Sequence, residues 1–490
     1  MSELTELSAT ELAVRIGRRE ISAAEVAEAS LSRVRDYNPA LNAIVTLNPG
    51  FVDEARAADR RLAAGGMPRP LEGVPFVAKD ILATKGLRTT FGSLVHEHNV
   101  PDADAISVER LRAAGALLLG KGNTPEFATD INTNNKIFGL TRNPVDLNVS
   151  AGGSSGGSAS AVAADMAPIA LGTDHGGSIR IPAAWCGLCG LRPSPGRVAV
   201  HRPDFGWDTL VAHVEGPIAR TVADLGAMMS ALVGPDDRDP SSLPSEGYDY
   251  TAAAMPADFT GRRVAYSADL NGLFPVDPEI ETATRAAARV FEGMGCIVEE
   301  ASFDGSDLRE IIAGTRGFGL VARFADLVER SGDRMSSQLV GQVSDGVRQD
   351  LRTVGKAERQ RTAYWHRVRT FLERHEFLLT PTVGAPPFRI NQPLPTKVGG
   401  RPVDRYYDIF LATYAFSVVG LPVASVPCGF TKEGLPIGLQ IVGRRLRDDS
   451  VLRAAAAYTA CCPQHLARRP IPLAAALPLS GELVTPGMRS

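Results

Sequence analysis

The sequence predicts an α/β fold in which a large mixed, mostly parallel central β-sheet is covered on both faces by α-helices. Apolar stretches with the length of buried strands alternate along the chain with longer stretches of helical periodicity. Neither an internal repeat nor a low-complexity linker divides the 490 residues, so we expect one domain over 1–490. Its expected parts are N-terminal helices over 1–65, a core over 66–230, a variable helical region over 250–375 and the C-terminal part of the core over 376–466.

The first 65 residues predict helices. Residues 8–11 and 22–25 both have the Ser-x-x-Glu pattern of a capping box, followed by apolar residues at helical spacing. We expect Asn38-Pro39 to stop the second of these helices, because proline disfavours helical geometry in the residue before it. The next expected elements are a buried strand within 72–82, a helix and then a strand over 105–121, and a closely packed buried helix over 159–165.

The second half predicts strands and helices in alternation. Asp277-Pro278 is typical of a helix start, and this helix should run to about Met294. The charged stretch 306–375 predicts a solvated helical layer. A strand should begin within 261–266, strands at 377–381 and 423–427 should each be stopped by proline, a helix should span about 448–461, and the Pro-rich tail from 467 should wrap the surface.

Composition and charge argue against a disordered chain, a membrane-spanning protein and a protein attracted as a whole to polyanions. Hydrophobic residues make up 44% and charged residues 22%, as in soluble globular proteins. The 52 basic and 55 acidic residues give a net charge of −3, so nothing draws the whole molecule to nucleic acid or to an anionic membrane. No apolar run reaches the roughly 18 residues of a membrane span. Six cysteines and an acidic N-terminus without the features of a signal peptide predict a cytoplasmic protein.

The most unusual segment is Gly-Gly-Ser-Ser-Gly-Gly-Ser at 152–158. A flexible linker is one interpretation, but the flanking residues are not typical of linkers. Phosphate binding is a second, although the lysine of a phosphate-binding loop is absent. The third interpretation is catalytic, because residues 172–180 place Ser178 after Gly176 and Gly177. Successive N–H groups in such a turn can converge on an oxyanion.

A serine nucleophile needs a base. His175 is three residues from Ser178 and the Gly-x-Ser-x-Gly elbow is absent, so a Ser-His-Asp arrangement is unconvincing. Lys79 ends an apolar strand and is the better candidate. Burial disfavours the ammonium form, so a buried lysine can be neutral near pH 7 and accept a proton.

These segments resemble the amidase signature family. Val-Ala-Lys-Asp at 77–80, the Gly-Ser segment at 152–159 and Gly-Thr-Asp-His-Gly-Gly-Ser-Ile-Arg at 172–180 match the three marks of that family in order and spacing. The resemblance covers roughly residues 5–465. Further matches lie at 122–126, 139–144, 182–187, 216–220, 420–424 and 434–440.

The resemblance implies a fold, an activity and a set of roles. Ser178 would be the nucleophile that forms an acyl-enzyme, Ser154 a bridging serine after a cis peptide bond, and Lys79 the base. The backbone N–H groups of His175, Gly176, Gly177 and Ser178 would form the oxyanion hole. Supporting roles fall to Ser155, Thr173, Asp174 and Arg180, and the acyl pocket would include Phe127, Ala128 and Thr129.

His175 departs from the family pattern, because family members mostly carry smaller or aliphatic residues there. Its imidazole either contacts the substrate or only packs against neighbours, and both interpretations stay open. The Cys-Gly-Leu-Cys segment at 186–189 lies inside the recognised pattern, which favours buried small apolar residues over a redox site. We expect no metal and no organic cofactor.

The sequence therefore predicts a stand-alone amidase that hydrolyses a small-molecule carboxamide, with esters and carbamates as plausible further substrates. The alternative is the amidase subunit of a tRNA-dependent amidotransferase. Those subunits carry Met-Asp-Glu-Phe where this chain has Thr-Pro-Glu-Phe at 124–127, and Pro-Gly-Gly-Ser-Ser where it has Ala-Gly-Gly-Ser-Ser at 151–155. Both differences favour the stand-alone enzyme. Many family members are dimers, so the resemblance makes a homodimer one possible assembly, but the sequence leaves the oligomeric state open.

Overall fold

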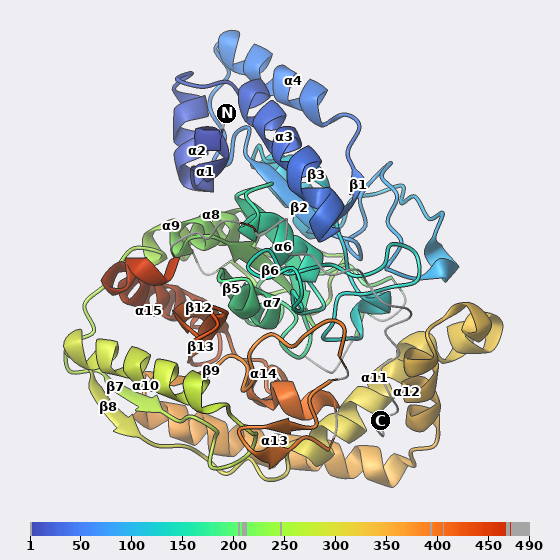
Figure 1. The fold of residues 1–490 in the computed structure, drawn as a ribbon, viewed down its shortest axis with the longest axis vertical. Helices are drawn as coiled ribbons and strands as arrows, with labels where there is room; N and C mark the ends of the chain where they lie inside the picture. The colour runs from blue at the N-terminus through green and yellow to red at the C-terminus, as the bar shows by residue number, and fades with distance from the viewer. Residues whose placement is uncertain are drawn as a thin grey trace.

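An eleven-stranded mixed sheet forms the centre of the structure, a computed structural model that describes residues 2–203, 206–207, 213–245, 247–392, 394–404, 406–466 and 471 (Figure 1). The strands follow the order β1-β3-β2-β4-β6-β5-β12-β13-β9-β7-β8. Their bounds are β1 Ile44–Leu47, β2 Pro75–Lys79, β3 Leu117–Gly122, β4 Ile169–Asp174, β5 Cys189–Arg192, β6 Val214–Ala219, β7 Arg263–Tyr266, β8 Ile297–Glu300, β9 Phe377–Pro381, β12 Val423–Phe430 and β13 Pro436–Val442; a separate pair is β10 Lys397–Val398 and β11 Arg401–Pro402.

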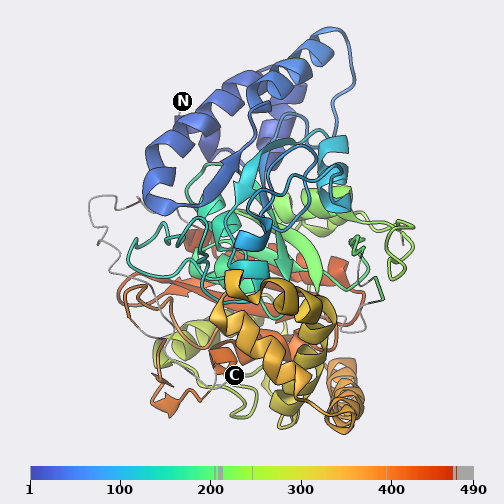
Figure 2. The ribbon, with the colours of Figure 1, turned by 90° about the vertical axis from the view of Figure 1, so that its right-hand side faces the viewer.

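Helices surround this sheet. The N-terminal helices lie at one end of the long axis, and α10 to α13 lie toward the other end (Figures 1 and 2). The helices are α1 Ser2–Glu6, α2 Ala9–Gly17, α3 Ala23–Leu41, α4 Phe51–Ala63, α5 Ile106–Ala113, α6 Gly156–Ala163, α7 Arg180–Trp185, α8 Val222–Leu232, α9 Tyr250–Ala253, α10 Pro278–Gly293, α11 Leu308–Ser331, α12 Ser337–Val347, α13 Leu351–Arg374, α14 Leu411–Ser417 and α15 Asp448–Cys461, with short 3-10 turns η1 Leu94–His96, η2 Glu126–Ala128, η3 Gly332–Arg334, η4 Tyr406–Phe410 and η5 Pro463–Leu466.

The α/β class and the mixed sheet are confirmed, but the expectation of mostly parallel strands is wrong. Four ladders are parallel, namely β2–β3, β2–β4, β7–β8 and β7–β9. The other six ladders of this sheet are antiparallel. The parallel strands form two groups separated by β6, β5, β12 and β13. A connection as short as the one between β12 and β13 can only join antiparallel strands.

Two proline predictions are also wrong. Pro39 lies inside α3, which continues to Leu41. The helix ends at Asn42, which takes a left-handed conformation, and Asn38 Oδ1 accepts hydrogen bonds from the N–H groups of Ala43 and Ile44. Pro427 does not stop β12, because the ladder with β13 shifts register just after it, and proline is tolerated at such a bulge. Both predicted capping boxes are confirmed, in α2 and α3. The predicted surface tail lies outside the described residues, apart from residue 471.

The core lies on both sides of the sheet. One large apolar cluster joins α2, α3, α8 and α15 to the strands, and a second joins α13 and α14 to β9 and β13. None of the helices in the described part of the chain combines the length and the apolar character needed to span a bilayer. The expectation that 1–490 is one domain stays a prediction, which a single cooperative unfolding transition would support.

Close packing of α6 on β3 generates a stability prediction. A methyl group on Gly157 would overlap the backbone of Asn123 and the carbonyl oxygen of Ala43. Gly157→Ala should therefore lower the free energy of unfolding by about 1–3 kcal/mol, as overpacking of a core does. A methyl group added to Gly355 in α13 would meet only Arg359 Nη1, at 3.8 Å, outside its own stretch of helix backbone. Gly355→Ala should raise stability by up to about 1 kcal/mol, because alanine is the better helix former. Urea unfolding of both variants measures the difference, and equal effects would contradict this packing.

Candidate active site

Lys79 stands at the carboxyl end of β2, where the side chain is completely buried. Its Nζ is hydrogen-bonded to Ser154 Oγ at 2.6 Å and to Thr173 Oγ1 at 2.9 Å. Thr173 belongs to β4, which runs parallel to β2, so the carboxyl ends of both strands meet at this point. Burial lowers the pKa of Lys79 well below that of a free lysine, and the nearby Asp174 carboxylate only partly opposes the change.

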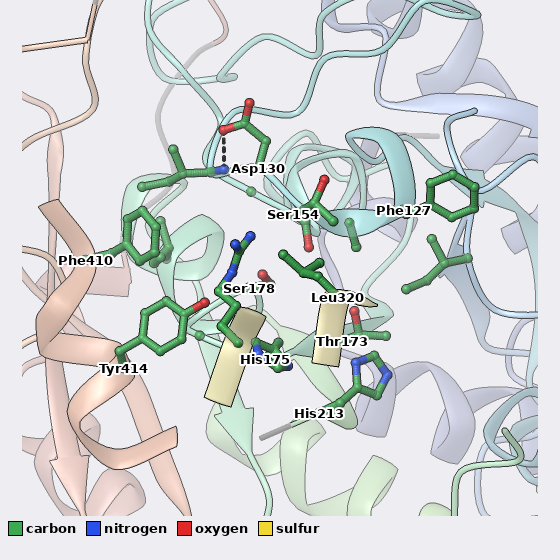
Figure 3. Close-up of a pocket in the computed structure, with 18 of the residues that line it drawn as sticks. Phe127, Asp130, Ser154, Thr173, His175, Ser178, His213, Leu320, Phe410 and Tyr414 are labelled. Carbon is green, nitrogen blue, oxygen red and sulfur yellow. Dashed lines mark hydrogen bonds between the residues drawn. The ribbon is translucent and has the colours of Figure 1, made fainter. Parts of the chain in front are cut away.

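Ser154 and Ser178 line one cavity (Figure 3). The peptide bond between Gly153 and Ser154 is cis, as the family resemblance implied. The two serine segments are tied together, because the N–H of Ser155 donates to the carbonyl oxygen of Ser178 at 3.2 Å. Ser155 Oγ also bonds the backbone of Thr173, at 3.3 Å to both its N–H and its carbonyl. The structure thus brings the three predicted catalytic residues and two of the supporting residues to one place.

Asp174 organises the turn that carries Ser178. Its carboxylate accepts the N–H of Gly177 at 2.9 Å and that of Ile179 at 3.2 Å. Arg180 Nε and Nη2 donate to the two carboxylate oxygens, at 3.0 and 2.9 Å. Burial opposes the ionisation of Asp174, but the guanidinium groups outweigh it, so its pKa lies well below the usual range of a carboxyl.

Sequence reasoning missed Arg192. This completely buried residue of β5 donates from Nη1 to the carbonyl oxygen of Asp174 at 2.7 Å and to its Oδ1 at 3.3 Å. Arg180 reaches further, to Gln440 Oε1 at 2.8 Å and Ser417 Oγ at 2.6 Å. Residues from β5, β13 and α14 therefore hold the turn. An arginine directly after an otherwise apolar stretch, at 188–191, was the signal that could have identified Arg192.

The turn at 175–178, which was predicted to form an oxyanion hole, has fewer available donors than expected. Gly177 has φ 126°, and its N–H is directed to Asp174. The N–H groups of His175, Gly176 and Ser178 have no hydrogen-bond partner among the described residues. These three groups are therefore the available backbone donors beside the cavity.

The predicted substrate residues Phe127, Ala128 and Thr129 all line the cavity. Phe127 and Ala128 have left-handed backbone conformations, with φ 46° and 60°. The ring of Phe127 packs on that of Phe324, 4.9 Å between centroids. His175 also lines the cavity, beside His213 (Figure 3). Burial lowers the pKa of His175 well below the usual value, with Arg323 and Arg316 adding to the effect.

The description of 306–375 as a solvated layer is wrong for α11. Arg316, Leu320, Arg323 and Phe324 of this helix line the cavity. Their spacing places them on one helical face, a pattern that the sequence contained. Phe410 and Tyr414 complete the opposite wall (Figure 3). In the described part of the chain, no group of three or more His, Cys, Asp or Glu side chains is arranged to hold a metal ion.

Serine and lysine side chains thus meet at one cavity of an α/β fold, an arrangement suited to a hydrolase with a serine nucleophile. The family model Amidase matches residues 25–452, and the chain belongs to the amidase signature family. It is thus an amidohydrolase. An acylamidase of Rhodococcus erythropolis is 38% identical over 464 residues, 93% of this chain and 96% of the relative. One subunit of the glutamyl-tRNA(Gln) amidotransferase of Chloroflexus aurantiacus is 35% identical over 497 residues, 96% of this chain and 99% of the relative.

Solved structures agree with this assignment. A bacterial aryl acylamidase of the amidase signature family superposes with a TM-score of 0.88 at 30% identity, covering 96% of this chain and 99% of that one. A 6-aminohexanoate cyclic dimer hydrolase superposes with a TM-score of 0.84 at 30% identity and with the same coverage. The family resemblance drawn from the three motifs is therefore confirmed.

The Asp174 cluster generates a second prediction. Asp174→Asn should lower the free energy of unfolding by about 3–5 kcal/mol at pH 7, because it leaves buried guanidinium charges uncompensated. The folded-state pKa of Asp174 is lowered, so its contribution is present above the unfolded pKa of about 3.9 and is lost as pH falls below that value. The difference between wild type and variant should therefore shrink in acid.

Denaturant unfolding at several pH values measures this difference. Asp53→Asn is the matched control, since Asp53 pairs with Arg56 on the exposed surface of α4. It should cost about 1 kcal/mol at most. A comparable loss in both variants would contradict the role of the buried cluster.

Proposed function

We propose that this amidohydrolase acts alone on a small-molecule carboxamide through an acyl-enzyme on Ser178. Ser154 relays the proton and Lys79 is the base. The observation that carries the proposal is the buried hydrogen bond of 2.6 Å between Lys79 Nζ and Ser154 Oγ, at the cavity that Ser178 also lines. This arrangement provides a nucleophile, a relay and a base in sequence.

The environment of Lys79 suits a base. Its pKa is lowered by burial, so an appreciable fraction is neutral at a pH where a surface lysine would be charged. Lys121 is an internal comparison, because burial lowers its pKa to about 8. Lys121 instead bonds the carbonyl oxygen of Leu82 and Thr84 Oγ1, outside the cavity. Burial lowers the pKa of both lysines, but of the two only Lys79 is bonded to a serine of the cavity.

The reaction then follows from the positions of these groups. Ser178 Oγ attacks the carbonyl carbon while its proton passes to Ser154 Oγ and the Ser154 proton passes to Lys79 Nζ. The oxyanion of the tetrahedral intermediate accepts hydrogen bonds from the turn at 175–178. When the C–N bond breaks, the proton returns through Ser154 to the leaving nitrogen. Water, deprotonated by the same relay, then hydrolyses the ester on Ser178 and releases the carboxylic acid.

Two parts of the cavity wall are apolar, although Arg316 and Arg323 of α11 also line the cavity. Phe127, Leu320 and Phe324 form one side, and the stacked rings of Phe410 and Tyr414, 5.6 Å apart, form the other. The small side chain of Ala128 leaves room beside them. We therefore propose aryl or bulky alkyl amides as substrates, with esters and carbamates cleaved through the same acyl-enzyme. The names of the similar acylamidase and aryl acylamidase support this choice.

The second candidate is the amidase subunit of a tRNA-dependent amidotransferase. The 35% identity to such a protein over nearly the whole chain supports it. The departures at 124–127 and 151–155 from the pattern of those subunits favour the stand-alone enzyme. Hydrolysis by the isolated protein, without ATP, tRNA or a partner, separates the two candidates.

We further propose that the enzyme is a cytoplasmic homodimer. Its six cysteines are unpaired and five of them are buried, as expected in a reducing compartment. Light scattering on the purified protein measures the assembly, and a monomer at micromolar concentration would contradict the dimer.

The mechanism predicts the effects of three substitutions. Ser178→Ala and Lys79→Ala should lower kcat for anilide hydrolysis by about 10⁴-fold or more, as removal of catalytic triad members does. Ser160→Ala is the matched control: Ser160 follows the same Gly-Ser segment, but its Oγ donates to the Arg142 carbonyl oxygen, away from the cavity. Its activity should be unchanged. Activity that survived Ser178→Ala would contradict the assignment of the nucleophile.

The lysine also predicts a pH profile. Because the neutral form of Lys79 is the active base, kcat/KM should rise with pH and level off above the pKa of Lys79 in the free enzyme. That pKa is lowered, so the rise should end well below the ordinary lysine value of about 10.4. Rates for a panel of anilides, alkyl amides, cyclic amides and esters at several pH values measure it. A rise that ended only above a pH of about 10 would contradict the neutral lysine.

A further inference from the structure

Helix α14, outside the three sequence motifs, is fastened to the turn that carries Ser178. Thr413 Oγ1 donates to the carbonyl oxygen of Gly176. Arg180 Nη1 donates to the Thr413 carbonyl oxygen at 3.0 Å, and its Nη2 donates to Ser417 Oγ at 2.6 Å. These bonds set the position of the next residue of the helix, Tyr414, relative to the turn.

The ring of Tyr414 packs directly on Gly176. A Cβ atom added to Gly176 would overlap Cε2 and Cζ of Tyr414. Cζ bears the hydroxyl group, so Oη is one bond away from a ring atom that packs on Gly176. The side chain is only 5% exposed and lines the cavity. Figure 3 shows its hydroxyl directed toward Ser178. Within the described residues this hydroxyl makes no hydrogen bond with another protein group.

Of the four backbone N–H groups at 175–178, only that of Gly177 is already used within the described part of the protein. The N–H of Gly177, at the centre of the turn, donates to Asp174 Oδ1 at 2.9 Å, so it points away from any oxyanion at Ser178. The Tyr414 hydroxyl is a further donor in the wall of the cavity that Gly176 and Ser178 also line. Pre-positioned donors that need no reorganisation are the most effective ones for a developing negative charge.

We propose that Tyr414 Oη donates a hydrogen bond to the oxyanion of the tetrahedral intermediate and so acts as a side-chain member of the oxyanion hole. This inference rests on the acyl-enzyme mechanism proposed above. A bond to an oxyanion is stronger than one to a neutral carbonyl oxygen. The hydroxyl therefore stabilises the transition state more than bound substrate, and its effect falls on kcat and not on KM.

Tyr414→Phe tests the proposal, because phenylalanine keeps the ring on Gly176 and removes only the hydroxyl. The variant should lose about 10²-fold in kcat, the order found when one oxyanion-hole donor is removed. The loss should be equal for an anilide and a phenyl ester with the same acyl group, since both form the same oxyanion, with KM unchanged. Affinity for a trifluoromethyl ketone analogue, which forms an oxyanion on Ser178, should weaken in parallel.

Tyr364→Phe is the matched control. Tyr364 is buried and its hydroxyl donates to the Ala415 carbonyl oxygen of the same helix α14 at 3.0 Å. This variant loses a hydrogen bond that anchors α14 but no group of the cavity. It should lower Tm and leave kcat unchanged.

Three results would overturn the proposal. The first is an unchanged kcat in Tyr414→Phe. The second is a loss of kcat for the anilide alone, which would mean that the hydroxyl bonds the leaving nitrogen and not the oxyanion. The third is an equal loss in Tyr364→Phe, which would mean that only the position of α14 matters. Ser178→Ala tests the acyl-enzyme mechanism separately. If the wild type is active, Ser178→Ala is inactive and Tyr414→Phe keeps full activity, only the proposed role of the Tyr414 hydroxyl is contradicted.

Discussion

The site depends on the complete burial of one amino group, that of Lys79. Lys79 is buried at the end of β2, and burial of an ammonium group is costly unless it is compensated or the group is neutral. Here the immediate partners of Nζ are the hydroxyls of Ser154 and Thr173, which are neutral. The neutral amine is therefore favoured, and a serine stands where its proton can be exchanged. A carboxylate in direct contact would stabilise the ammonium form and abolish the base.

Asp174 shows how the fold meets this condition. It follows Thr173 directly and is close enough to raise the pKa of Lys79 in part. Its carboxylate nevertheless forms ion pairs with the guanidinium groups of Arg180 and Arg192. The same carboxylate binds the N–H groups of Gly177 and Ile179 and so shapes the Ser178 turn. One buried ionic cluster thus pairs the negative charge with arginines rather than with the lysine, and it positions Ser178, the proposed nucleophile. Both effects require the sheet, because Asp174 and Arg192 come from strands on either side of β6.

Local patterns predicted the parts of the fold that local forces determine. The capping boxes of α2 and α3 and the buried strands β2 and β9 were predictable, because hydrogen bonds and periodicity within a few residues decide them. Strand direction was not, since pairing between β5 and β12 joins segments more than 200 residues apart. The same holds for the site. Motif spacing predicted Lys79, Ser154 and Ser178, whereas Arg192 and Tyr414 reach the turn only through the packing of the sheet and α14.

The residues that carry the proposed reaction and many of those that shape the acyl pocket therefore come from different parts of the chain. The proposed reaction centre is built from β2, the Gly-Ser segment at 152–158, β4 and the turn that follows β4, which lie within about a hundred residues. Much of the cavity wall comes from α11 and α14, which occur much later in the chain and pack on Phe127 and Gly176. Substitutions on α11 can therefore reshape the acyl pocket while leaving the lysine and its hydrogen bonds in place. Substitution of Thr413 or Ser417 on α14 would also disturb the turn at Ser178, because their side chains bond Gly176 and Arg180.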